Sequence, residues 1–241
     1  MSNSVTVTVH SVDDLLQTGY DRDVLVKEFV RINSEAWPPP VPERYLWTQE
    51  KVLAQFENCP YLLFCAFLNG KVVGTLSAIY TTEAEALNTH DWEKMSGDGT
   101  FSTHRPDGDC AFGADLSVPP GAIAGEKLFE FGIFSGVVLA NRKGVFLGSR
   151  VPRYHKYAHS MSIEAYVGLG KEKTRDPEIR LYESGGFRVV KVIPGYMEDP
   201  DSLNYGVLMF WKNPYYRFTR FIPDPIMKAV SAIVHRWINR H

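Results

Sequence analysis

The feature that most constrains this chain is an alternating strand that ends in a Pro-Pro-Gly break. Residues 111–118 alternate in the manner of a half-buried β-strand. Pro119, Pro120 and Gly121 interrupt it, and a helix follows to residue 140. The start of such a helix carries unpaired backbone N–H groups and the positive end of the helix dipole, which attract phosphate. The sequence therefore predicts a site for a cofactor that bears a pyrophosphate.

Two other segments place this unit in a family. Residues 61–80 contain two apolar runs joined by Asn69-Gly70, the strongest short signal of a β-hairpin. Residues 180–190 contain a helix end, a Gly turn and a new strand. This order, a hairpin, then a strand–loop–helix unit, then a Leu-Tyr-Glu-x-x-Gly-Phe block, resembles the GNAT superfamily of acyl-CoA-dependent acyltransferases over about residues 20–213.

The resemblance implies an α/β fold with a mixed, twisted and splayed central sheet and flanking helices. We expect residues 1–213 to form the acyltransferase domain. Residues 214–241 are expected to form an amphipathic helix that packs on this domain or on a partner. Its apolar stripe holds five residues at helical spacing: Ile226, Val230, Ile233, Trp237 and Ile238.

Charge and cysteine usage exclude several classes of protein. With 26 basic and 28 acidic residues, the chain has no general attraction to nucleic acid or to an anionic membrane. Its three cysteines have no paired spacing, so neither a disulfide framework nor a zinc site is expected, and no metal cofactor. Signal-peptide and membrane-span patterns are not found in the sequence. We expect a cytoplasmic protein without a membrane partner.

The predicted phosphate site departs from the family pattern Arg/Gln-x-x-Gly-x-Gly/Ala. Pro120 stands where the family has Arg or Gln, and Ile123 replaces a Gly, so we expect Ile123 to crowd the approach of the phosphate. The resemblance implies that Leu116 and Val118 bind the pantetheine and carbonyl of acetyl-CoA or another acyl-CoA. Backbone amides of the following turn would hold the pyrophosphate: Gly121, Ala122, Ile123, Ala124 and Gly125. The alternative is a plain strand-to-helix turn, since short Gly patterns are weak signals.

The Tyr of the Leu-Tyr-Glu-x-x-Gly-Phe block falls on Tyr182. The resemblance implies that its phenol protonates the departing thiolate, and a phenol with a pKa of about 10 is suited to that transfer. The alternative is a Tyr that packs at a helix end with a satisfied hydroxyl.

Motifs at residues 97–100, 104–109, 152–158 and 195–202 narrow the resemblance. They are similar to the GNAT branch fused to carbon–nitrogen hydrolases and, more loosely, to GNAT-type domains that load polyketide synthases. The loading branch implies decarboxylation of malonyl-CoA by a His and a hydroxyl residue, with a Trp on the acceptor side. We assign these roles to His155, Ser117 and Trp37 respectively. The alternatives are an ordinary loop histidine, a satisfied buried hydroxyl and a Trp packed at a helix end.

Three functions follow from these patterns. The leading prediction is transfer of an acetyl or similar group from CoA to a small-molecule amine. The second is decarboxylation of malonyl-CoA and loading of a carrier-protein thiol, and the third is a GNAT-shaped regulator with weak or absent catalysis. A homodimer is compatible with each. Residues 81–110, a long polar connection, are expected to form a lid or substrate-side loop.

Overall fold

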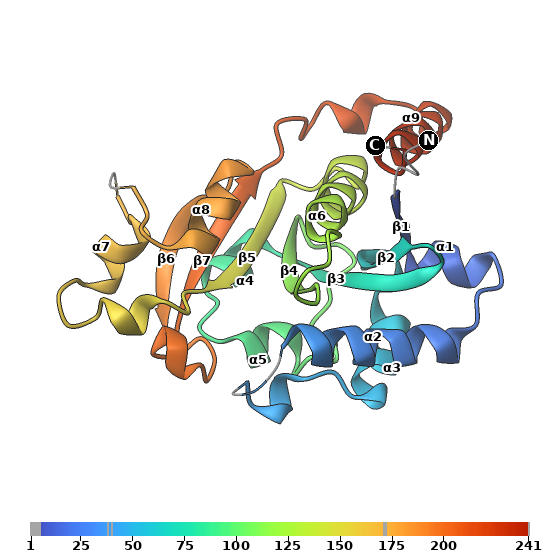
Figure 1. Ribbon diagram of the computed structural model, residues 1–241. Coiled ribbons are helices and arrows are strands. Elements are labelled where there is room, and N and C mark those ends of the chain that lie inside the picture. The colour runs from blue at the N-terminus through green and yellow to red at the C-terminus, as the bar shows by residue number, and fades with distance from the viewer. Residues whose placement is uncertain (1–5, 38, 40, 171–172, 241) are drawn as a thin grey trace, which may run out of the picture.

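A seven-stranded mixed sheet organises the protein (Figure 1). The computed structural model describes residues 6–37, 39, 41–170 and 173–240. Neighbouring strands are antiparallel except β4 and β5, which are parallel. In sheet order the strands are β1 (Val7–Ser11), β2 (Leu63–Leu68), β3 (Lys71–Thr81), β4 (Cys110–Ser117), β5 (Gly144–Arg150), β7 (Tyr205–Lys212) and β6 (Arg188–Pro194). The predicted α/β class with a mixed sheet is confirmed.

Helices cover both faces of the sheet, with α2 and α3 on one face and α6 and α9 on the other (Figure 1). Side-chain caps fix several starts, since Asp21, Thr48 and Asp176 accept backbone N–H bonds at the first turns of α2, α3 and α8. None of the described helices is long and apolar enough to cross a bilayer. The helices are α1 (Val12–Gln17), α2 (Arg22–Ala36), α3 (Gln49–Asn58), α4 (Glu83–Leu87), α5 (Trp92–Ser96), α6 (Gly125–Ile133), α7 (Ile163–Val167), α8 (Pro177–Ser184) and α9 (Asp224–Ile238).

The predicted hairpin is present as β2 and β3. Asn69 and Gly70 both have positive φ, 53° and 76°, which a two-residue type I′ turn requires. This turn sets the pairing of β2 with β3 that begins at Leu68 and Lys71.

Strands β4 and β5 separate because each stays paired with a different neighbouring strand. Parallel pairing of β4 with β5 ends at Gly113 and Leu147. Beyond that pair, β4 continues along β3 and β5 continues along β7. A bulge accompanies the parting, since Ser77 pairs with Asp115 and Ala78 with Gly113, which leaves Ala114 as an extra residue. The splayed centre predicted by the resemblance is therefore confirmed.

Residues 81–110 differ from the expected lid. They form the short helices α4 and α5 and pack on the body of the protein. The Trp92 indole is buried and its Nε1 donates to the bulged Ala114 carbonyl at 2.9 Å. The polar composition that suggested a loop instead supplies caps such as Asp91 and turn residues such as Gly97, at φ 60°.

The C-terminal helix α9 packs on α6 and β1 of the same chain. The His235 ring stacks on Phe131 with 4.3 Å between centroids, and the Asn239 side chain bonds the backbone N and O of Val9 at 2.6 and 3.1 Å. The apolar stripe expected to drive packing is largely exposed, with Ile226 at 53 % and Ile233 at 67 %. Ile238 alone of the predicted stripe is buried. The division at residue 213 and the homodimer stay predictions.

Glycines on two paired strands leave room for the Tyr196 ring. A Cβ on Gly148 of β5 or Gly206 of β7 would overlap the Tyr196 ring. The ring is buried, and the Tyr196 carbonyl accepts the Trp92 backbone N–H at 2.9 Å. Glycine on both strands therefore lets the segment after β6 close against the sheet.

We expect Gly206→Ala to lower the free energy of unfolding by about 1–3 kcal/mol, because the added methyl group displaces a buried ring. Gly185→Ala is the matched control, since its Cβ would lie 3.4 Å from the nearest atom, the Tyr182 carbonyl oxygen. Urea unfolding of both variants measures the difference. Equal stability of the two variants would contradict the close packing of the Tyr196 ring on Gly206.

Candidate active site

The parted strands enclose a cavity of about 490 Å³, here called the wedge cavity. Its walls come from the ends of β4 and β5, from α2 and α8, and from the segment after β6. Six ionisable side chains line it: Tyr45, Asp115, Arg150, Glu178, Tyr182 and Tyr196. The fold therefore brings acids, phenols and a guanidinium to one space.

Asp115 lies on β4 where the strands separate, and its carboxylate is held by donors from three sides. Trp37 Nε1 donates to Oδ1 at 3.1 Å, and Ser117 Oγ donates to Oδ2 at 2.7 Å. Asn33 of α2 adds a longer contact from Nδ2 to Oδ1 at 3.4 Å. Burial nevertheless raises the pKa of Asp115 to about 6, because removal from water penalises the carboxylate more than these bonds stabilise it.

Ser117 and Trp37 both lie beside Asp115, and their predicted roles stay predictions. Ser117 is fully buried, and its Oγ accepts from Asn33 Nδ2 at 3.2 Å and from Trp37 Nε1 at 3.0 Å. Trp37 lines the wedge cavity while its indole N–H is directed at Asp115 and Ser117. Both residues therefore position Asp115.

Glu178 and Tyr182 lie one turn apart on α8 and face the same cavity. The Asp176 cap starts this helix, and Tyr166 of α7 donates to Asp176 at 3.0 Å. Burial, together with the charge of Asp176, raises the pKa of Glu178 to about 7. Burial also raises the pKa of Tyr182, so its phenol keeps its proton. Within the described chain, neither side chain has a hydrogen-bond partner.

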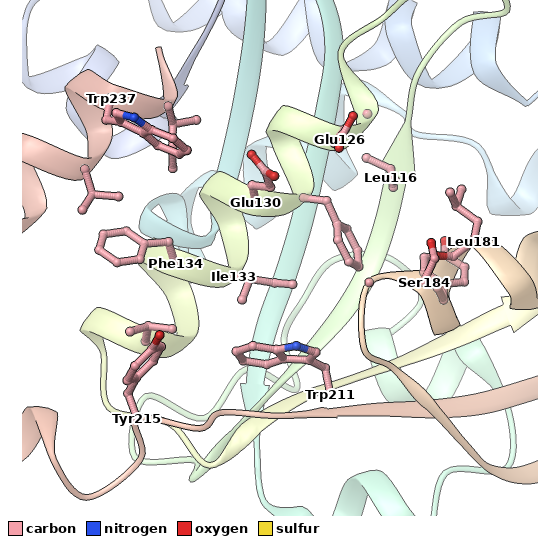
Figure 2. A pocket seen from close by; sticks show the side chains of 17 residues that line it. Leu116, Glu126, Glu130, Ile133, Phe134, Leu181, Ser184, Trp211, Tyr215 and Trp237 are labelled. Atoms are coloured by element: carbon pink, nitrogen blue, oxygen red, sulfur yellow. The ribbon is translucent and has the colours of Figure 1, made fainter. Parts of the chain in front are cut away.

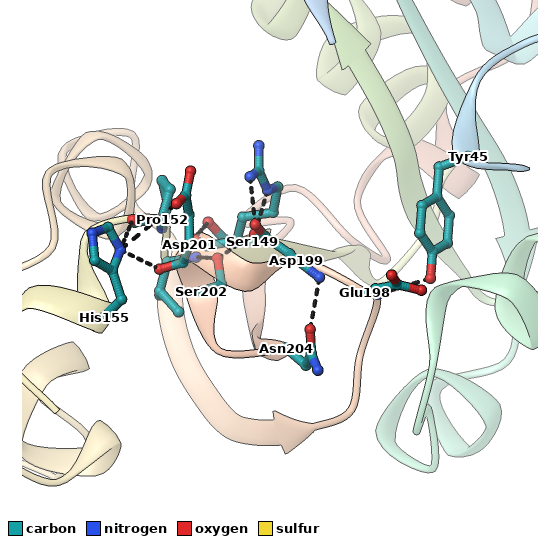
Figure 3. Close-up of polar contacts among 11 residues, drawn as sticks. Tyr45, Ser149, Pro152, His155, Glu198, Asp199, Asp201, Ser202 and Asn204 are labelled. Carbon is teal, nitrogen blue, oxygen red and sulfur yellow. Dashed lines mark hydrogen bonds and ion pairs between the residues drawn. The ribbon is translucent and has the colours of Figure 1, made fainter. Parts of the chain in front are cut away.

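Arg150 ends β5 and is held by a buried ion pair. Its Nε and Nη2 donate to the two carboxylate oxygens of Asp199 at 2.6 and 2.8 Å, and Ser202 also donates to Asp199 (Figure 3). The Arg150 guanidinium lies 5.3 Å from the centre of the Trp37 ring. Asp199 thus neutralises the cation nearest to the wedge cavity.

His155 is not brought together with Ser117 and Tyr182. It lies in the insertion after β5, does not line the wedge cavity, and is 36 % exposed. Its Nδ1 contacts the carbonyl oxygens of Pro152 and Asp201 at 3.0 and 2.9 Å (Figure 3). These contacts tie the insertion to the turn that carries Asp199, which corrects the expected catalytic placement.

A second cavity, the outer groove, has a volume of about 740 Å³ and runs along α6. Figure 2 shows Leu181 and Ser184 of α8 on one side of α6, and Trp237 of α9 on the other. The outer groove shares four lining residues with the wedge cavity: Leu116, Phe129, Leu181 and Tyr182. An extended ligand can therefore run from the start of α6 to the parted strands.

The predicted phosphate turn stands at the mouth of this path, before α6. Gly121 has φ 84°, and Ala124 precedes the first helical residue without a side-chain cap, which leaves the first amides of α6 available. Ile123 is 68 % exposed, and its crowding of the phosphate approach stays a prediction. The charges near this turn are unfavourable for binding phosphate. Glu126 lines the groove, and the Lys127 ammonium donates to the Val7 carbonyl at 2.8 Å.

Sequence reasoning missed Asp115 and Glu178. An acidic residue inside an otherwise apolar central strand was the available signal for Asp115. Glu178 gave no signal, because an acid in the first turn of a helix is ordinary. Across the described ranges, no three His, Cys, Asp or Glu side chains gather as a metal site.

Asp115→Asn removes the buried charge and nearly preserves the side-chain size. The pKa of Asp115 is about 6 in the folded protein, against an ordinary 3.8, so the native state binds this proton more tightly. Stability from this group is present below about pH 4 and is lost as the pH rises to about 6. We expect the unfolding free energy of the wild type, followed by urea titration, to fall by about 2–3 kcal/mol relative to the variant over that interval. A difference that is constant from pH 4 to 7 would contradict the raised pKa.

Comparison with known proteins places this geometry in context. No family model matches the chain. The uncharacterized N-acetyltransferase YkwB of Bacillus subtilis (strain 168) is 29 % identical over 195 residues, which make up 80 % of this chain and 86 % of that protein. The probable hydrolase YhcX of the same organism is 27 % identical over 224 residues, which cover 90 % of this chain but 42 % of that protein.

Solved structures show the same fold. The GphF GNAT-like decarboxylase in complex with isobutyryl-CoA has a TM-score of 0.67 and 21 % identity, over 85 % of this chain and 98 % of that one. The loading GNATL domain of CurA from Lyngbya majuscula has a TM-score of 0.68 and 16 % identity, over 86 % and 97 % of the two chains. With the parted strands, these findings show that the chain has the GNAT fold.

Proposed function

We propose that the protein transfers an acetyl or similar acyl group from coenzyme A to the amine of a small molecule. The observation that carries this proposal is the Asp115 carboxylate, which lines the wedge cavity where β4 leaves β5. A free amine is protonated in neutral water and attacks a thioester only after losing that proton. With a pKa of about 6, Asp115 is ionised at neutral pH and is a stronger base than an ordinary aspartate.

Tyr182 is the proposed acid for the departing thiolate. Its side chain lines both the outer groove and the wedge cavity, so it stands on the path proposed for the cofactor. The amine nitrogen forms a bond to the thioester carbon, the C–S bond breaks, and the sulfur takes the phenol proton. The proton that the new amide nitrogen must lose then returns to the Tyr182 phenolate. Burial raises the pKa of Tyr182, so the phenol is protonated at neutral pH but is a weaker acid than an exposed tyrosine.

The acyl-CoA itself would lie along the shared path. Beyond Gly113, β4 has no β5 partner, so its edge can hydrogen-bond the pantetheine near Leu116 and Val118. Amides of Gly121, Ile123, Ala124 and Gly125 would face the pyrophosphate, whereas the Ala122 N–H already donates to the Pro119 carbonyl at 3.0 Å. A phosphate site without a nearby cation binds weakly, because charge-assisted bonds are the strong ones.

The charges favour an amine over the alternatives. Asp115 and Glu178 attract a cationic acceptor and repel the carboxylate of malonyl-CoA, and Arg150 is already paired with Asp199. His155, which the decarboxylase alternative requires, lies outside the wedge cavity. A regulator without catalysis has no need of a buried carboxylate beside a phenol, since a buried unpaired charge costs stability.

We expect Asp115→Asn to lower kcat/KM by about 10²–10⁴-fold and to remove the rise in rate through pH 6. Tyr182→Phe is expected to lower kcat with little change in the affinity for CoA, because the phenol acts only as the thiolate forms. Release of free CoA from acetyl-CoA in a panel of primary amines measures both effects. His155→Ala is the control and should keep wild-type activity. Wild-type rates in Asp115→Asn at every pH from 5 to 8 would exclude the proposed base.

We expect Pro120→Arg, which restores the family's basic residue, to tighten acetyl-CoA binding about tenfold, since an arginine–phosphate bond contributes about 1.5–3 kcal/mol. Calorimetric titration measures the affinity. Ile123→Ala is the matched control and should leave it unchanged, because that side chain is 68 % exposed. Identical affinities in all three proteins would argue against phosphate binding at this turn.

A further inference from the structure

The C-terminal helix α9 presents its apolar stripe outward instead of toward the core. Ile226, Val230, Ile233 and Trp237 recur at helical spacing and are between 37 % and 67 % exposed. An amphipathic helix on the surface of a globular protein ordinarily turns such a stripe toward the core. Packing within the described part of the chain therefore does not explain the stripe.

The side of α9 that faces the protein is held largely by polar contacts. The Nε2 atom of His235 lies 2.8 Å from Ser135 Oγ, and the His235 ring stacks on Phe131. Asn239 bonds the backbone of β1, and Ile238 adds a buried apolar contact. These contacts fix the helix with its apolar stripe outward.

The segment that leads into α9 adds exposed aromatic rings. Phe218 and Phe221 are each 72 % exposed and lie between β7 and α9 (Figure 1). Exposed apolar patches mark interaction sites, and Trp and Phe rings suit the boundary between lipid headgroups and acyl chains. We call the exposed apolar residues of this region the C-terminal surface: Phe218, Phe221, Ile226, Val230, Ile233 and Trp237.

The charge of this region indicates an anionic partner. Residues 214–241 contain five Lys or Arg residues and one Asp, whereas residues 1–213 contain 21 Lys or Arg residues and 27 Asp or Glu residues. The near balance over the whole chain conceals this difference. Arg217, Arg236 and Arg240 are exposed, and the last two flank Trp237 at the end of α9. Basic residues that border an apolar stripe attract anionic lipid headgroups.

We propose that the C-terminal surface docks the protein on anionic lipid bilayers, with α9 lying in the plane of the headgroups. The apolar stripe would enter the boundary with the acyl chains, and the arginines would contact lipid phosphates. The docking is peripheral, because the other side of α9 stays packed on the protein. Trp237 also lines the outer groove, so docking would bring that groove beside the headgroups. This inference is independent of the proposed acyl transfer.

A second copy of the chain fits this surface less well than a lipid bilayer does. A two-fold contact would set the same face of both copies against each other. Both copies would then bring the same excess of basic residues to the contact, and like charges oppose association. Anionic headgroups instead complement that charge.

Co-sedimentation of the full chain with lipid vesicles tests the docking. We expect the protein to bind vesicles of phosphatidylcholine with about 30 % phosphatidylglycerol at least tenfold more tightly than vesicles of phosphatidylcholine alone, because each exposed arginine adds attraction to an anionic surface. Binding should weaken as NaCl rises from about 0.05 to about 0.5 M, since salt screens this attraction. Equal affinity for the two kinds of vesicle, or no binding to either, would overturn the proposal.

Two single variants test the apolar and the charged parts of the surface separately. Ile233→Ser, which lies outside the outer groove, should weaken binding to the anionic vesicles about tenfold, because less apolar area leaves water. Arg236→Gln should weaken it about fivefold. Val24→Ser is the matched control, since Val24 is 41 % exposed on α2, at the opposite face of the sheet (Figure 1), and it should bind like the wild type. Wild-type binding by both Ile233→Ser and Arg236→Gln would contradict docking through α9.

Sedimentation velocity without vesicles separates lipid docking from self-association. We expect a monomer in both the wild type and Ile233→Ser. A wild-type dimer that Ile233→Ser dissociates would show that a second copy covers this surface, and it would overturn the proposal. Acyl transfer plays no part in these measurements, so the docking can fail while the proposed function stands.

Discussion

The parting of β4 from β5 is the constraint on which the candidate site depends. Each strand leaves the other after Gly113 and Leu147 because it stays paired with its outer neighbour, β3 or β7. That divergence opens an edge of backbone inside the protein, where a thioester can replace the missing strand. The bulge at Ala114 turns the following residue, Asp115, toward α2 and its donors. Shape and chemistry therefore arise from the same few residues.

The charges that line the wedge cavity determine which kind of acceptor it favours. Asp115 is held by Trp37, Asn33 and Ser117, yet burial keeps its proton affinity high. The one guanidinium described in the wedge cavity is bound to Asp199, so the space favours a cationic acceptor. At the phosphate turn the balance is opposite to the family pattern, since the nearest lining charge is Glu126. The proposed site therefore has a candidate base in Asp115 and no described cation lining the groove beside the predicted phosphate turn.

Local signals in the sequence predicted the fold well and the site in part. Three local patterns indicated backbone conformations that the structure contains. They are the Asn69-Gly70 turn, the Thr48 cap and the alternation of residues 111–118. The placement of Tyr182 beside the cavity followed from the family block, although its role stays a prediction. Asp115 was missed because its burial depends on partners at residues 33 and 37, far away in sequence. The exposure of the α9 stripe and the position of His155 outside the wedge cavity could not be predicted for the same reason. Periodicity and residue type do not specify which surface a segment packs against.

Amide hydrogen exchange on addition of acetyl-CoA tests the central claim most directly, because it reports on individual backbone groups. The account predicts slower exchange at the β4 edge around Leu116 and at the first turn of α6, with the outer strand β6 unchanged. No added protection at millimolar acetyl-CoA, or protection confined to other elements, would contradict the account.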